Sequence, residues 1–401
     1  MRPAIILIII IAFLASAAGG IFIFNAEKKI LVENIPAAST LIPSTTSTSE
    51  IQEEKFIRKP EELINQVETL IAQTQKFIEE EKEKLALIEE VKAKSSKIKG
   101  IYIGSSRSAN NFKTILDETE LNGIVIDVKE AYGQNLPVSL KSLTSELHKE
   151  NNWVIARMAV FRDSSLVEGK PEWYLMSTTS LPWQDKAQQY WLDPQNEEVQ
   201  NYIIEFAKKA IDYGFDELQF DYIRYPDDYD YVLGTEKIKV IGDFFSKISQ
   251  ELRSYKPQVI LSVDLFGYVA TQFNSYGTGQ RLIDAGKYFD YLSFMLYPSH
   301  FYGGFAAKGI NFLYPDVVVH PYEVIYYSVD SARDYLSLLG LETKIRPWLQ
   351  DFDLAVDSAR GVVYDAEKIR FQIEAAQNAT SSGWLLWNPS YVYTKEALMV
   401  E

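Results

Sequence analysis

Residues 215–226 read Phe-Asp-Glu-Leu-Gln-Phe-Asp-Tyr-Ile-Arg-Tyr-Pro, and this stretch indicates how the chain folds. Apolar Leu218 and Phe220 alternate with polar residues, which is the pattern of a buried β-strand. Asp221 stands where the apolar run ends, and Arg224 follows it. In parallel α/β folds, functional side chains gather at the carboxyl ends of strands. The stretch therefore predicts a strand that presents Asp221 at a functional edge, although a lone Asp in this place can also cap a loop.

The same design recurs along the chain after Lys99. Short apolar runs alternate with helical patterns, and such alternation predicts βα units around a parallel sheet. The expected strands are 100–103, 123–128, 153–160, 217–220, 259–263, 291–296, 344–349 and 383–387, and the helical patterns include 196–213, 240–255, 322–339 and 366–381. Eight repeats in roughly 300 residues predict an α/β fold, the closed (β/α)8 TIM barrel. An open doubly wound sheet is less well supported, because no Gly-rich phosphate loop follows these strands.

Residues 1–28 are expected to form a transmembrane signal-anchor. Residues 4–24 carry no charge, and roughly 20 such residues span the hydrocarbon core of a bilayer. A secretory signal peptide cleaved after Ala15-Ser16-Ala17 is the alternative, but the apolar run continues through 21–24 beyond that site. With the usual insertion of a leading segment, the barrel would be membrane-anchored on the extracytoplasmic side. Cleavage would instead secrete it.

Two further segments precede the barrel. Residues 29–59 are expected to form a linker, because 36–49 are rich in Ser, Thr and Pro, a composition that cannot bury a core. Residues 60–98 predict a charged helical stalk, and the barrel then takes residues 99–401. The stalk has a heptad seam of Ile64, Val67, Ile71, Thr74, Ile78, Glu81, Leu85 and Ile88. This pattern fits either a homodimeric coiled coil or a single helix against the barrel, and the sequence leaves both open.

The composition disfavours several classes of function. The formal net charge of −15 argues against nucleic acid as a partner. The absence of cysteine removes disulfides, thiolate nucleophiles and zinc–thiolate sites. With only three histidines, a His-rich metal centre or a Ser-His-Asp triad is poorly supported, so neither a metal nor another cofactor is expected. Acid–base chemistry then falls mainly to carboxylates, tyrosines and arginines.

Charged and aromatic side chains stand at the ends of most expected strands, and a barrel would bring them to one mouth. Charge close to an apolar barrel is costly unless it is paired or used. The catalytic candidates are Asp221, Asp264 and Asp127. The candidate substrate-binding residues are Lys129, Arg157, Arg224, Tyr225, Tyr297, His300, Trp348, Gln350, Trp387 and Asn388.

Paired carboxylates beside aromatic rings suit the cleavage of glycosidic bonds. One carboxylic acid protonates the leaving oxygen, while an ionised carboxylate attacks the anomeric carbon or activates water. Asp221 and Asp264 end neighbouring strands, so a short separation and a retaining mechanism are expected. Arg157 or Arg224 would keep Asp221 ionised, and burial against aromatic rings would raise the pKa of Asp264, the acid. The aromatic side chains would stack on sugar rings.

Six motifs, in order, carry a resemblance to a known family. They are Lys-Gly-Ile-Tyr-Ile (99–103), Gly-Ile-Val-Ile-Asp-Val-Lys (123–129), Tyr-Trp-Leu-Asp-Pro (190–194), the stretch 215–226, Met-Leu-Tyr-Pro-Ser-His (295–300) and Gly-Trp-Leu-Leu-Trp-Asn (383–388). From about Lys99 to the C-terminus, the chain resembles the bacterial putative glycosyl hydrolase domain family. That resemblance implies a barrel of the TIM-barrel glycosidase group.

The resemblance also implies roles for individual carboxylates. In amylase-like barrels the nucleophile is an Asp at the end of the fourth strand, which corresponds to Asp221. The acid is usually a Glu after the fifth strand, where this chain has Asp264, so the identity of the acid stays open with Asp127 in reserve. An anchor, a linker and a stalk would hold such a barrel near the cell envelope, so the expected substrate is a cell-envelope or extracellular polysaccharide or oligosaccharide.

Three alternatives remain on sequence grounds. The barrel could bind glycans without turnover, or it could be a structural platform on a stalk that assembles envelope partners. A metal-dependent deacetylase that uses Asp127, Asp221 and His300 is the weakest, because no motif has the spacing of metal ligands.

Overall fold

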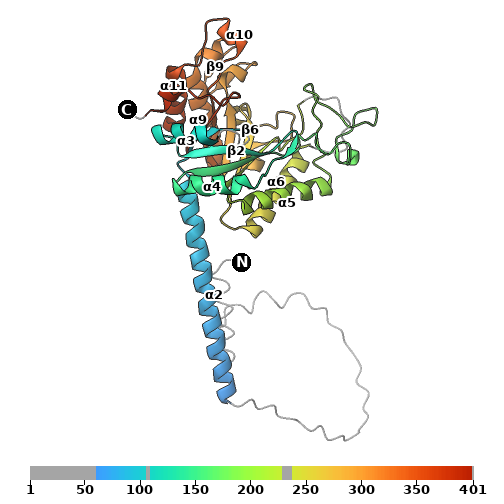
Figure 1. The fold of residues 1–401 in the computed structure, drawn as a ribbon, viewed down its shortest axis with the longest axis vertical. Helices are drawn as coiled ribbons and strands as arrows, with labels where there is room; N and C mark the ends of the chain where they lie inside the picture. The colour runs from blue at the N-terminus through green and yellow to red at the C-terminus, as the bar shows by residue number, and fades with distance from the viewer. Residues whose placement is uncertain (1–59, 105–108, 228–236, 400–401) are drawn as a thin grey trace, which may run out of the picture. The chain divides into compact units, whose positions relative to one another are not determined.

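The computed structural model describes residues 60–104, 109–227 and 237–399, and within them the chain forms a closed parallel barrel with a long helix before it (Figure 1). Lys84–Glu401 make up one compact unit. The expected anchor (1–28) and linker (29–59) lie outside the described residues. Among the residues that are described, no helix combines the length and the apolar character needed to cross a membrane.

The barrel has eight parallel strand positions, as the sequence predicts. The strands are β1 (Lys99–Tyr102), β2 (Gly123–Glu130), β4 (Trp153–Ala159), β5 (Glu217–Asp221), β6 (Ile260–Phe266), β7 (Tyr291–Leu296), β10 (Lys344–Ile345) with β11 (Trp348–Gln350), and β12 (Trp384–Trp387). The barrel is closed because β1 pairs with both β2 and β12. Short β3 (Gly133–Gln134) pairs antiparallel with β2, and β8 (Phe305–Ala307) and β9 (Ile310–Phe312) form a separate hairpin.

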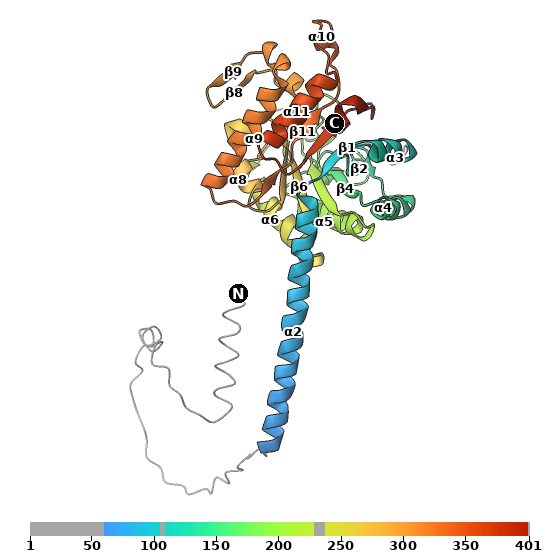
Figure 2. The same cartoon turned by 90° about the vertical axis from the view of Figure 1, so that its left-hand side faces the viewer.

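Helices surround the barrel, and Figure 2 shows α3 and α4 on one side of it and α9 with the β8–β9 hairpin on the other. They are α3 (Ala109–Glu118), α4 (Ser139–Lys149), α5 (Glu197–Asp212), α6 (Lys237–Tyr255), α7 (Val269–Gln272), α8 (Leu282–Ala285), α9 (Pro321–Leu338), α10 (Ala355–Ser358) and α11 (Ala366–Asn378). Asn196 is the N-cap of α5, and its side chain accepts hydrogen bonds from the backbone of Glu198 and Val199 at 2.9 and 3.3 Å. The four helical patterns named from the sequence agree with α5, α6, α9 and α11 to within a few residues.

The seventh strand differs from its expected form. The sequence predicts one strand over 344–349, but the structure has β10 and β11, with Arg346 and Pro347 between them. Proline has no backbone N–H to contribute to a ladder, which interrupts regular pairing at this point. Both pieces still pair with β7, so the barrel remains closed.

The expected stalk is helix α2 (Pro60–Ser95). Seam residues such as Ile64 and Leu85 are more than half exposed within this chain. Homodimerisation through the seam stays a prediction.

A buried ion pair closes the amino-terminal end of the barrel. Arg346 Nη1 donates to both carboxylate oxygens of Glu217, at 2.9 and 2.7 Å, and both side chains are fully buried. Arg346 Nη2 also donates to the Ser95 carbonyl oxygen at 2.5 Å, and its guanidinium lies 3.8 Å from the centre of the Tyr291 ring. The Ser95 and Tyr291 hydroxyls share a hydrogen bond of 2.7 Å. The last turn of α2 is therefore part of the barrel floor.

Candidate active site

Arg157, on β4, contacts three carboxylates at the carboxyl end of the barrel. Its Nη1 donates to Asp127 Oδ1 on the neighbouring strand β2 at 2.5 Å. Its Nη2 donates to Asp221 Oδ2 at the end of β5, and its Nε lies 3.8 Å from Asp264 Oδ2 on β6. The structure thus brings the three predicted catalytic carboxylates together around one predicted binding residue.

Each carboxylate also accepts a hydrogen bond from a donor other than Arg157, and this bond fixes its orientation. The Tyr102 hydroxyl donates to Asp127 Oδ2, and the Tyr222 backbone N–H donates to Asp221 Oδ1 at 2.6 Å. Trp348 Nε1 donates to Asp264 Oδ1 at 2.8 Å. Charge-assisted bonds of this kind are among the stronger hydrogen bonds in proteins. The cluster is therefore held in place before any ligand arrives.

The electrostatics of the cluster separate Asp264 from the other two carboxylates. Burial raises the pKa of Asp264 well above its usual range, and the negative charge of Asp221 raises it further, against the opposing effect of Arg157. Asp264 is only 2% exposed, which accounts for the large effect of burial. Burial alone would lower the pKa of Arg157, but Asp127 and Asp221 outweigh it and raise that pKa above its ordinary value. The site therefore combines a carboxyl group whose pKa is raised with a guanidinium whose pKa is raised as well.

Aromatic rings form the wall of the mouth on the β7 and β12 side. Tyr297 and Trp387 are stacked with ring centres 5.3 Å apart, and Phe352 lies edge-on to them at 5.6 and 5.0 Å. Trp387 is partly exposed, so it has a free surface for a ligand. Trp348 is 2% exposed and donates to Asp264, so it supports that carboxyl group and offers no stacking surface.

Two of the predicted binding residues do not face the mouth. The pairing of β2 with β4 shifts register between Asp127 and Lys129, and such an irregularity re-aims the following side chain. Lys129 is fully buried, with its Nζ 2.8 Å from Asp163 Oδ2 and 2.7 Å from the Ala159 carbonyl oxygen. Tyr225 is also fully buried, and its hydroxyl accepts a hydrogen bond from Gln195 at 3.2 Å. Neither side chain is available to a ligand in this conformation.

Two other predicted residues hold loops around the mouth. Gln350 accepts from the Ser299 backbone N–H at 3.1 Å and donates to the Phe352 carbonyl oxygen at 2.8 Å. Asn388 donates to the carbonyl oxygens of Asp351 and Val392. Both amides are therefore bonded within the protein, and their role in substrate binding stays a prediction.

Arg224 lies among aromatic rings beside the cluster. Its guanidinium is 4.4 Å from the centre of the Phe266 ring and 5.1 Å from that of Trp191. Its Nη1 donates to the Tyr225 carbonyl oxygen at 2.9 Å, and Asp227 lies 3.7 Å away. Burial lowers the pKa of Arg224, with Asp227 opposing the shift. Arg157, and not Arg224, is the cation in contact with Asp221.

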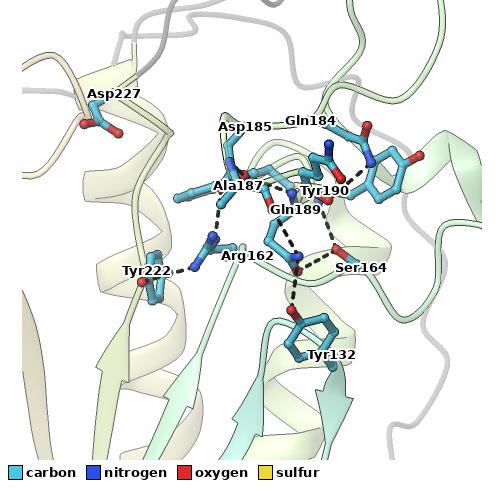
Figure 3. A network of polar contacts seen from close by, with 12 residues as sticks. Tyr132, Arg162, Ser164, Gln184, Asp185, Ala187, Gln189, Tyr190, Tyr222 and Asp227 are labelled. Carbon is cyan, nitrogen blue, oxygen red and sulfur yellow. Dashed lines mark hydrogen bonds and ion pairs between the residues drawn. The ribbon is translucent and has the colours of Figure 1, made fainter. Parts of the chain in front are cut away.

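The segment between β4 and α5 contains a network of polar contacts, which Figure 3 shows from close by. Asp185 organises this segment, since it accepts from Arg162 Nε and Trp191 Nε1, both at 3.0 Å, and from the backbone of Gln189 at 2.9 Å. Arg162 also lies over the Tyr222 ring, 5.1 Å from its centre. Because Tyr222 directly follows Asp221, this network holds the segment between β4 and α5 next to the candidate nucleophile.

His300 does not join the carboxylates. Its ring lies 5.4 Å from those of Tyr297 and Phe352, and burial lowers its pKa. Within the described residues, no three side chains of the metal-binding types are grouped so that they could hold an ion. Among the described residues, His300 is therefore not grouped with Asp127 and Asp221, the other two ligands of the deacetylase alternative.

The sequence argument missed several residues at the site. Tyr102 is the partner of Asp127, and Tyr391 packs against Tyr102 with ring centres 5.5 Å apart. Glu130 lies near the same carboxylate, and burial together with Asp127 raises its pKa. Tyr102 ends β1 in the motif Lys-Gly-Ile-Tyr-Ile, so its place at a strand end was a usable signal. Tyr391 comes from a loop whose course no local pattern predicts.

Sequence comparison agrees with this geometry. The family described as putative glycosyl hydrolase domain matches residues 135–393, which is more than half of the chain. The chain belongs to the putative glycosyl hydrolase domain family. The match is narrower than the resemblance from Lys99, since it leaves out β1, β2 and Asp127. No curated protein matches the sequence.

Solved structures add a distant likeness in fold to this glycosyl hydrolase domain. The α-L-fucosidase isoenzyme 2 from Paenibacillus thiaminolyticus aligns with 75% of this chain at 15% identity and a TM-score of 0.52, and the chain spans 48% of that enzyme. An α-galactosidase from Thermus thermophilus aligns over 75% of this chain and 60% of its own at 16% identity, with a TM-score of 0.46. A hypothetical protein from Ruminiclostridium thermocellum is 31% identical over 41% of this chain and 96% of its own, with a TM-score of 0.36. The first of these supports the barrel fold.

Proposed function

We propose that the barrel is a glycoside hydrolase in which Asp264 is the general acid and Asp221 is the nucleophile or base. The observation that carries this proposal is the contrast between two neighbouring carboxyl groups on one guanidinium. Asp264 is buried and has a raised pKa, whereas Asp221 is paired directly with Arg157. A protonated carboxylic acid beside an ionised carboxylate is the pair that glycosidic cleavage requires.

The reaction follows from these positions. Asp264 gives its proton to the glycosidic oxygen as the bond to the anomeric carbon breaks. As a nucleophile, Asp221 attacks that carbon as the bond breaks; water then hydrolyses the glycosyl-enzyme, and Asp264 takes the proton of that water and is restored. As a base, Asp221 instead removes a proton from the water that attacks the carbon. Asp221 and Asp264 both contact Arg157, which favours the short separation of a retaining enzyme. Asp127 is bonded to Arg157 and Tyr102 and its side chain is fully buried, whereas that of Asp221 is partly exposed, so the role of Asp127 in the proposal is to position the guanidinium.

The proposed substrate is a cell-envelope or extracellular polysaccharide or oligosaccharide. The family supports a sugar substrate, and the partly exposed Trp387 beside Tyr297 offers a stacking surface for a sugar ring. The apolar segment 4–24 supports export of the barrel and its attachment to the membrane.

A hydrolysis screen tests this function. The wild-type protein is compared with Asp221→Asn and Asp264→Asn on a panel of polysaccharides, and product is measured as new reducing ends. Each substitution is expected to lower kcat by at least about a hundredfold, since each removes one half of the acid–base pair. Asp243→Asn, on the exposed face of α6, is the control. Full activity in Asp221→Asn would refute the assignment, and binding without turnover would identify a glycan-binding barrel instead.

A further inference from the structure

A pocket of about 390 Å³ opens beside the acid, between the loops that follow β6 and β7. Its floor is formed by Phe266 and Met295, which are paired residues of β6 and β7. Its wall consists of Tyr268, Tyr276, Tyr297, His300, Phe301 and Tyr302, with Asp227 at the edge. The volume is in the range of sites that bind small molecules.

The pocket adjoins Phe266, which lies just beyond Asp264 on the same strand, β6. Phe266 is two residues after Asp264, so both side chains point to the same face of β6 and are about 7 Å apart along it. The general acid must reach the oxygen that joins the two sugars. A pocket immediately outward from Asp264 is therefore placed for the sugar that leaves.

The walls match the chemistry of a sugar ring. Tyr268 and Tyr276 are stacked, with ring centres 5.1 Å apart and an angle of 3° between the planes. The Tyr268 hydroxyl accepts a hydrogen bond from the Gly303 backbone at 2.9 Å, which fixes this wall. Aromatic faces bind the apolar faces of pyranoses, and the Asp227 carboxylate and the His300 imidazole can bond to hydroxyl groups at the edge.

Aromatic rings continue outward from the pocket. His300 and Tyr302 are stacked at 6.1 Å, and Tyr302 lies 5.6 Å from Tyr314. Arg360 covers the Tyr314 ring at 5.0 Å. Tyr302 is 59% exposed, so this row of rings leads from the buried mouth to the surface.

We propose that this pocket and the ring row bind the leaving-group part of a glycan, so that the enzyme cleaves bonds between sugars of an oligosaccharide or polysaccharide. This inference rests on the proposed function of Asp221 and Asp264. It goes further than that function, because it excludes an enzyme that acts only on glycosides whose leaving group is a small molecule other than a sugar.

The test uses the full chain and two kinds of probe. Cellohexaose, maltohexaose and chitohexaose have sugars on both sides of the cleaved bond, whereas the corresponding glycosyl fluorides have no leaving sugar. For the series that is turned over, kcat/KM is measured for both probes in the wild type, Tyr276→Ala and Tyr302→Ala. The ratio of hexasaccharide to fluoride kcat/KM is expected to fall about tenfold in each variant, because a stacking surface is lost. Tyr255→Ala removes an equally exposed tyrosine on α6 and should keep the wild-type ratio.

The outcomes separate this inference from the proposed function. If both probes are turned over and neither pocket variant changes the ratio, the pocket assignment is wrong and the proposed function stands. If the wild type turns over no probe, and no hexasaccharide binds to Asp264→Asn in calorimetry, the proposed function fails and this inference falls with it.

Discussion

Trp348→Phe is the substitution that most directly tests the assignment of Asp264 as the acid. The indole Nε1 donates to Asp264 Oδ1 at 2.8 Å, and this bond favours the ionised form of that carboxyl group. Phenylalanine keeps an aromatic ring in the barrel but has no donor. The ionised form then loses support, so the pKa of Asp264 rises further. Because the acid works only in its protonated form, the alkaline limb of the pH profile is expected to move to higher pH.

The size of this shift follows from the strength of the bond. A hydrogen bond to a charged group contributes about 1.5–3 kcal/mol, and 1.4 kcal/mol corresponds to one pH unit, so an upward shift of about one unit or more is expected. The measurement is kcat/KM against pH. Trp173→Phe, which removes an indole bonded to Glu198, is the control and should leave the limb in place. An unchanged limb in Trp348→Phe, or one displaced to lower pH, would refute the assignment of Asp264.

The remaining predictions concern charge, stability and stereochemistry. Arg157→Gln leaves the buried carboxylates of Asp127 and Asp221 without their cation. The free energy of unfolding in urea is expected to fall by about 3–5 kcal/mol at pH 7 and by less at pH 5. An equal fall at both pH values would contradict a stabilising ion pair. Burial raises the pKa of Asp351 to about 6, above its unfolded value of about 3.9, so the folded state should lose about 2–3 kcal/mol as the pH rises from 4 to 6, and Asp351→Asn should flatten that slope. Ser95→Ala removes the partner of the Tyr291 hydroxyl and should lower the free energy of unfolding by about 1–2 kcal/mol. The neighbouring Ser96→Ala removes a hydroxyl that donates to the Ala93 carbonyl oxygen of α2 and should cost much less; equal costs would argue against the barrel-floor contact. Proton NMR of the first product should show retention of anomeric configuration, and inversion would place a water between the two carboxylates.

The fold could be predicted because it depends on local periodicity. Alternating apolar residues at eight places gave strand positions that agree with the structure to within a few residues, since a buried strand and its flanking helices must each repeat with a fixed period. The exception was 344–349, where Pro347 divides the strand. Its neighbour Arg346 is buried in a pair with Glu217, a contact across the barrel that no local pattern records.

The site was only partly predictable. Strand-end position placed Asp127, Asp221 and Asp264 together, because carboxyl ends of parallel strands meet. The same rule failed for Lys129, since one shift in register redirects a side chain. It also could not show that Gln350 would be used to hold loops, because its partners lie in segments whose paths depend on the finished tertiary structure.

The cluster around Arg157 has a consequence for inhibition. One guanidinium is paired with two carboxylates, Asp127 and Asp221, and lies near a third carboxyl group, Asp264, so the acidic groups of the site outnumber its cation. A sugar passing through an oxocarbenium-like state develops positive charge in that place, and fixed charges that are already oriented stabilise it without rearrangement. A protonated iminosugar carries such a positive charge in its ground state, so the same carboxylates would attract it. It should bind more tightly than its neutral carbocyclic counterpart of equal shape.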